Sequence, residues 1–141
     1  MKTTITRFVL AAAIAAAAAG AAEAQNMKAN IPFTFRAGAA VLPAGDYRID
    51  AMNANRVVVF YSDTTRKGAM VLPTGTTNPS KYWDSDSDPV LVFECTGSGR
   101  CSLTTLWYGG GAPAIAIPHR AATRDEHASF RFVHLTKSNG D

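Results

Sequence analysis

Three aspartates stand at alternate positions in the sequence, Asp84, Asp86 and Asp88. Carboxylates spaced in this way are oxygen donors of the kind that calcium loops supply. An EF-hand loop also needs a glycine at its sixth position and a glutamate at its twelfth, and Pro89 and Cys95 stand there instead. Another type of calcium loop remains open, beside the commoner interpretation of a solvated acidic loop. The sequence suggests no other metal site, and we predict no cofactor.

The two cysteines, Cys95 and Cys101, are separated by the residues TGSGR. Two glycines between two apolar runs are typical of a hairpin turn. We therefore expect a disulfide across the tip of a hairpin, which would stabilise the fold by roughly 2 kcal/mol through loop closure. Redox catalysis usually requires the spacing Cys-x-x-Cys, and a zinc site requires further ligands, so a structural disulfide is favoured over both.

Four aromatic residues form two adjacent pairs, Tyr82 with Trp83 and Trp107 with Tyr108. If these rings were exposed on one face, they could stack on sugar rings or hold an apolar ligand, because an aromatic ring offers a broad flat contact area. The alternative for Trp107 is a core position, since it stands in phase with Leu103 on an expected strand. The four residues are thus the candidates for ligand stacking.

The remaining candidates for catalysis do not form a recognisable group. His119, His127 and His134 lie apart in the sequence, and no His-Glu-x-x-His motif is present. Ser98 stands between two glycines at the expected hairpin tip, whereas a nucleophilic serine stands on a turn from strand to helix. The glycines at 109–111 open no helix, so they lack the context of a phosphate-binding loop. We predict that the protein is not an enzyme, although a site assembled from distant residues remains open.

These candidates would be positioned by β-strands, because apolar and polar residues alternate through most of the chain. Near the start, for example, Ile31, Phe33 and Phe35 share one face of a strand and Arg36 lies on the other. Segments with strand character stand at residues 31–36, 47–51, 57–61, 68–72, 90–95, 102–108, 114–117 and 130–135. We predict an all-β fold, an antiparallel β-sandwich or small barrel of about eight short strands.

One stretch of the sequence is nearly repeated. Residues 36–45 read RAGAAVLPAG and residues 66–75 read RKGAMVLPTG. Proline followed by glycine is typical of a tight turn that leads into a strand. Two interpretations stay open, one strand–turn element used twice in the fold, or coincidence among common turn residues.

The first residues of the chain predict a cleavable secretory signal peptide with a helical apolar segment. Lys2 and Arg7 precede an apolar run at residues 8–19. This run is too short to span a bilayer core of about 30 Å. The sequence AEA at residues 22–24 offers the small-x-small pattern of a cleavage site, which makes Gln25 the first mature residue.

Cleavage would divide the chain into a signal peptide, residues 1–24, and a single β-domain, residues 25–141. We expect the domain to be exported, to the periplasm or outside the cell, with no membrane span after signal cleavage. Export would place both cysteines where disulfides persist. The signal carries two basic residues and one acidic residue, so its removal lowers the formal net charge of +3 by one. Because the remaining basic residues are scattered, we expect no nucleic-acid binding.

Two motifs in the domain resemble a known family. Residues 27–36 read MKANIPFTFR and residues 42–47 read LPAGDY. They resemble the IPF-x-F and L-P-A-G-x-Y signature of a family of short exported bacterial β-rich proteins. The resemblance extends over roughly residues 27–118, and the chain departs from the family pattern at its cysteine-containing hairpin and at residues 130–135. It implies a β-rich fold and an exported location, and it implies no activity.

From these patterns we expect a non-enzymatic domain that acts by binding or assembly at the cell envelope or outside. Its partner would be a surface glycan, another protein, or a second copy paired through an exposed edge such as residues 31–36. One alternative is a carrier barrel for a small apolar ligand, with a cavity lined by Phe33, Phe35, Val59 and Phe93. The other alternative is a carbohydrate-binding module that uses the paired aromatic residues.

Overall fold

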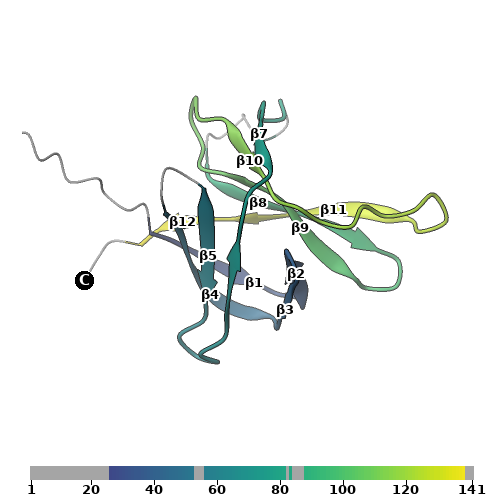
Figure 1. Cartoon of the computed structure of the whole chain (residues 1–141), viewed down its shortest axis with the longest axis horizontal. Coiled ribbons are helices and arrows are strands. Elements are labelled where there is room, and N and C mark those ends of the chain that lie inside the picture. The colour runs from purple at the N-terminus through teal and green to yellow at the C-terminus, as the bar shows by residue number, and fades with distance from the viewer. Residues whose placement is uncertain (1–25, 53–55, 82, 84–87, 139–141) are drawn as a thin grey trace, which may run out of the picture.

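The structure is a computed structural model that describes residues 26–52, 56–81, 83 and 88–138. The predicted signal peptide, residues 1–24, lies outside the described residues. No helix in the described part of the chain is long and apolar enough to cross a membrane. In these described residues twelve strands make two sheets (Figure 1), so the prediction of an all-β fold is confirmed as a sandwich, with more strands than the eight or so expected.

The five-stranded sheet is antiparallel throughout and has the order β12-β1-β4-β5-β6. Its strands are β1 (Met27–Ile31), β4 (Gly45–Met52), β5 (Val57–Tyr61), β6 (Gly68–Val71) and β12 (Thr136–Lys137). The burial of β1 alternates strictly, because Met27, Ala29 and Ile31 face the other sheet and the residues between them face solvent. Because successive side chains point to opposite faces, this alternation buries one face of the sheet and exposes the other to solvent.

The seven-stranded sheet has the order β11-β8-β9-β10-β7, with β2 on the β10 side of β9 and β3 beyond β2. Its strands are β2 (Phe35–Ala37), β3 (Ala40–Leu42), β7 (Gly75–Thr77), β8 (Val90–Thr96), β9 (Cys101–Trp107), β10 (Ala114–Ala116) and β11 (Ala128–His134). Strand β9 pairs in parallel with β2 at its beginning and antiparallel with β10 at its end. The short strands β2 and β10 therefore share one edge of β9.

The core lies between the two sheets and is filled by large side chains. The ring of Phe35 contacts those of Phe93 and Tyr47 edge to face, with centroids 5.4 and 5.3 Å apart. Phe33 meets Phe93 in the same way at 5.0 Å. Val59 lies on the opposite face of its strand from the buried residues and is not part of this core. Three of the residues proposed to line a carrier cavity thus pack against one another.

A β-bulge in β9 changes which face its side chains occupy. Leu103 lies opposite Phe93, but Thr105 lies opposite Val92, so Thr104 is one residue more than its partner strand provides. Such an extra residue reverses the alternation beyond it. The predicted phase of Leu103 and Trp107 is therefore wrong: Leu103 faces the core between the sheets, and Trp107 is buried on the outer face of the seven-stranded sheet.

The two nearly identical stretches have different structures. Gly38, in the first, has a φ of +60° in the turn between β2 and β3, whereas the matching glycine in β6 has no positive φ. Val41 is 52% exposed and Leu42 is buried, but at the matching positions Val71 is buried and Leu72 is 64% exposed. Since burial is reversed, the repeat is not one structural element used twice.

Candidate functional site

A disulfide between Cys95 and Cys101 closes the β8–β9 hairpin, as predicted. The two residues are directly opposite in the register and both side chains are buried in the core. At the tip, Thr96 N–H donates to the Arg100 carbonyl at 2.8 Å, and Gly99 takes a φ of +86°, which glycine adopts without strain. The hairpin tip is thus held by a covalent bond and by its own backbone.

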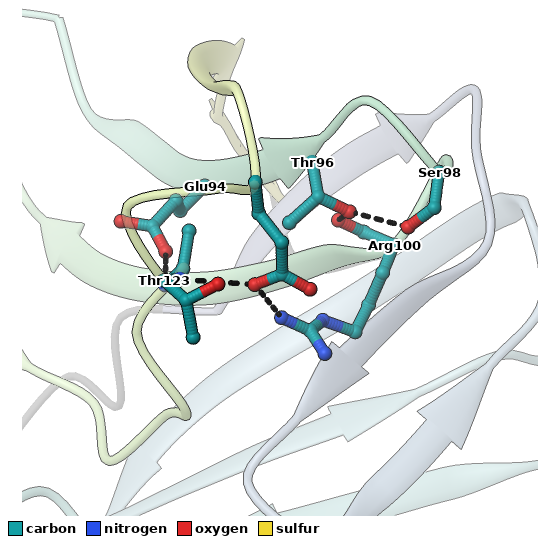
Figure 2. Close-up of polar contacts among 7 residues, drawn as sticks. Glu94, Thr96, Ser98, Arg100 and Thr123 are labelled. Atoms are coloured by element: carbon teal, nitrogen blue, oxygen red, sulfur yellow. Dashed lines mark hydrogen bonds and ion pairs between the residues drawn. The ribbon is translucent and has the colours of Figure 1, made fainter.

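The segment at residues 118–127 crosses the outer face of the seven-stranded sheet and is tied to it by two glutamates (Figure 2). Glu94 of β8 accepts a hydrogen bond from the Ala122 N–H at 2.6 Å. Glu126 accepts from the Thr123 N–H at 3.0 Å and from the Arg100 guanidinium at 3.2 Å. The Thr123 hydrogen bond, followed by the charge of Arg100, lowers the pKa of the Glu126 carboxyl.

Strand β11 forms one edge of the seven-stranded sheet. It pairs with β8 along all seven of its residues, and no other strand of the described chain pairs with it. Phe130 and Phe132 are 59% and 50% exposed, on the outer face beside Glu94 and Val92 of β8. The edge therefore offers free backbone hydrogen-bonding groups next to two exposed phenyl rings.

The other face of β11 carries a charge. The Arg131 guanidinium lies over the ring of Phe33, 5.3 Å from its centroid, within the range of a cation–π contact. The strand has the sequence ASFRFVH, so it contains no carboxylate. An inward-pointing charge of this kind is one way in which proteins discourage unwanted pairing at a sheet edge.

The predicted aspartate site is only partly described. Asp84 and Asp86 lie outside the described residues, and Asp88 is exposed. Within the part of the chain that the structure describes, no three His, Cys, Asp or Glu side chains come together as metal ligands. His119, His127 and His134 are each exposed. The calcium proposal for Asp84, Asp86 and Asp88 therefore stays a prediction.

The four stacking candidates do not form an exposed aromatic surface. Tyr82 lies outside the described residues. Trp107 is fully buried, its Nε1–H donates to the Ala112 carbonyl at 2.9 Å, and half-buried Trp83 packs on it with ring centroids 6.3 Å apart. Ligand stacking on Trp107 is thus a wrong prediction, because the β-bulge directs its ring under Trp83. Tyr108 is half-buried against the main core.

A hollow of about 540 Å³ lies beside β1 and β4, and four of the polar side chains in its wall are bonded in two pairs. Arg48 donates two hydrogen bonds to the Asp63 carboxylate, at 2.6 and 2.7 Å. Asn30 donates to Asp46 at 2.7 Å. The aromatic residue in the wall, Tyr47, is buried with its ring in the core. The hollow therefore lacks an exposed ring on which a sugar could stack.

Comparison of the chain with family models, with curated proteins and with solved structures finds no match. The resemblance to short exported bacterial proteins therefore stays a prediction.

The edge expected at residues 31–36 is not free, since Ile31 pairs with β4 and residues 35–37 pair with β3. Among the strands that end a sheet in the described residues, β11 is one of the longest, with seven residues; the alternating residues FRF at 130–132 indicate a strand there but not its place at an edge.

Proposed function

We propose that this protein is an exported, non-enzymatic binding domain that takes up an extended segment of another protein as an added strand on β11. The observation that carries the proposal is the free edge of a seven-residue strand with two half-exposed phenyl rings. In strand addition, main-chain hydrogen bonds supply affinity and alternate side chains supply specificity. Long exposed edges with apolar residues are uncommon unless something pairs with them.

Charge favours a different protein over a second copy of this chain. In a symmetric antiparallel pair of two β11 strands centred on Arg131, each Arg131 would lie opposite the other, and like charges in that position are destabilising. A segment with a carboxylate opposite Arg131 would remove this cost. Apolar side chains on either side of that carboxylate would lie beside Phe130 and Phe132, because strand residues alternate between faces.

The two alternative functions receive less support. A carrier needs an empty interior, and Phe33, Phe35 and Phe93 fill the place where its cavity would lie. A carbohydrate-binding module needs an exposed aromatic surface, and Trp107 is buried under Trp83. Export is supported by the predicted signal peptide and by the disulfide, since disulfides persist in oxidising compartments.

The test uses an array of nine-residue peptides in which apolar residues alternate with either glutamate or lysine. We expect the purified, disulfide-bonded protein to bind the glutamate peptides with micromolar Kd and not the lysine peptides. The double variant Phe130→Ser with Phe132→Ser should weaken binding at least tenfold, about 1.4 kcal/mol. The matched control is Val41→Ser with Leu72→Ser, which removes two equally exposed apolar side chains from other strands or turns.

Three results would overturn the proposal. One is that no peptide binds. Another is that the control variant weakens binding as much as the Phe130 and Phe132 variant does. The third is a concentration-dependent dimer in sedimentation velocity that the Phe130 and Phe132 variant abolishes, because it would make a second copy of the chain the occupant of the edge.

A further inference from the structure

Three arginines meet at a small hollow on the seven-stranded sheet, close to the disulfide-linked hairpin. The hollow has a volume of about 160 Å³ and is lined by Arg36, Gly38, Arg100, Ser102, His119 and Arg120. Arg36 and Ser102 lie side by side on the parallel pair of β2 and β9, with Arg100 at the beginning of β9. The backbone that follows β10 brings His119 and Arg120 to the same place.

The carboxylates around the hollow do not balance its guanidinium groups. Arg100 forms an ion pair with Glu126 at 3.2 Å. Neither Arg36 nor Arg120 has an ion pair with a carboxylate among the described residues. The other nearby carboxylate, that of Glu94, already accepts the Ala122 N–H. Two arginines at the hollow are therefore without a bonded counter-charge.

One further polar group of the wall, the Ser102 hydroxyl, suits an oxygen-rich anion. The Nδ1 atom of His119 lies 3.0 Å from the Ile117 carbonyl oxygen, which can only accept, so Nδ1 carries the hydrogen. This contact orients the imidazole ring. Ser102 is only 4% exposed and can donate its hydroxyl hydrogen into the hollow. Guanidinium forks match the geometry of phosphate oxygens and form short, charge-assisted hydrogen bonds with them.

We propose that this hollow is a binding site for a tetrahedral oxyanion, phosphate or a phosphate monoester, held by Arg36, Arg120 and Ser102. Its volume is that of about five water molecules at about 30 Å³ each, so it admits one such group with a little water. It is smaller than the roughly 300–1,000 Å³ of pockets that enclose larger organic ligands. A larger molecule would therefore present only its phosphate here.

The site goes beyond the strand-addition function and does not depend on it. Strand β8 lies between β11 and β9, whose Ser102 lines the hollow, and neither Phe130 nor Phe132 lines it. A variant of those two phenylalanines should keep its affinity for phosphate. The two proposals therefore succeed or fail separately.

The test is isothermal titration of the full, disulfide-bonded protein with inorganic phosphate at constant ionic strength, with chloride as the blank. We expect saturable binding in the millimolar range or tighter. Arg36→Gln and Arg120→Gln should each weaken binding at least tenfold. The matched control is Arg124→Gln, which removes the same charge from the same segment outside the hollow and should leave the affinity unchanged.

A gain-of-affinity variant makes the test sharper. Glu126→Gln removes the carboxylate that pairs with Arg100 and should tighten phosphate binding several-fold. Equal weakening by the Arg124→Gln control would show non-specific charge attraction and would overturn the site, as would the absence of saturable binding.

Vesicles of phosphatidylcholine with and without phosphatidic acid identify the source of the phosphate. Binding to the phosphatidic acid vesicles that is lost in Arg120→Gln assigns a lipid headgroup, and binding of free phosphate alone assigns a soluble ligand.

Discussion

The hydroxyl of Tyr108 is buried without a hydrogen-bond partner among the described residues, and we expect its removal to stabilise the protein. An unsatisfied buried polar group costs about 1–3 kcal/mol. Burial, followed by the negative charge of Asp50, raises the pKa of Tyr108 from 10.0 to about 12. This difference in pKa makes the phenolate less favourable in the folded state than in the unfolded state by about 3 kcal/mol. Tyr108→Phe removes the hydroxyl and keeps the ring.

The direction of the pH dependence follows from the raised pKa. Between about pH 10 and pH 12 the unfolded chain has lost the Tyr108 proton while the folded chain still binds it. The ionisation of Tyr108 therefore has no effect on the stability of the wild type below pH 10, and it lowers that stability as the pH rises from 10 through 12. Tyr108→Phe should be more stable than the wild type by about 1 kcal/mol at neutral pH. The difference in the free energy of unfolding between Tyr108→Phe and the wild type should increase by up to about 3 kcal/mol as the pH rises to 12 and above.

Urea unfolding followed by circular dichroism, at neutral pH and at several values above pH 10, measures both effects. The matched control is Tyr61→Phe, because Tyr61 is 39% exposed and its hydroxyl can reach water. The reasoning would be refuted if Tyr108→Phe were less stable at neutral pH, since the hydroxyl would then have a stabilising partner. It would also be refuted if wild type and Tyr108→Phe lost stability equally above pH 10.

Two further perturbations test the disulfide and the outer aromatic cluster. Replacing Cys95 and Cys101 together by serine should lower the free energy of unfolding by about 2 kcal/mol. Reductant should destabilise the wild type by a similar amount in urea unfolding, and an effect of reductant on the serine variant would contradict this explanation. Trp107→Ala should cost about 3–5 kcal/mol, because a fully buried indole is lost together with its hydrogen bond to Ala112. The fluorescence of Trp83 should then shift to longer wavelength as water reaches it, and an unchanged spectrum would mean that Trp83 does not depend on Trp107 for its cover.

The longer strands could be predicted because each has a run of apolar, β-branched or aromatic residues long enough to be recognised. The sequence predicted the region of β4 from alternation, that of β5 from a run of β-branched and aromatic residues, those of β8 and β9 from the apolar runs beside the hairpin, and that of β11 from its strand-like residues. Strands β2, β3, β7 and β12 have only two or three residues, too few for a periodic pattern to be recognised. They are strands because neighbouring strands supply their hydrogen bonds, and that information lies elsewhere in the chain.

The candidate sites were harder to predict than the fold. A single extra residue, Thr104, separates Leu103 from Trp107 onto opposite faces, and no local signal marks it. The arginine hollow joins Arg36, Arg100 and Arg120, which are far apart in the sequence and show no motif. Charge patterns along a chain reveal clusters of neighbours only, whereas this cluster arises from the pairing of β2 with β9.

What the sequence determined by itself is local: alternation that makes strands, glycines that close the hairpin, and two cysteines near enough to be joined. These features act over a few residues, so they can be recognised before the chain is folded. Only the tertiary structure decided that β11 is a free edge, that Trp107 is buried, and that Val41 and Val71 have opposite burial. Each of these depends on which strand lies beside which, and the physical cause is burial against residues that are distant in sequence.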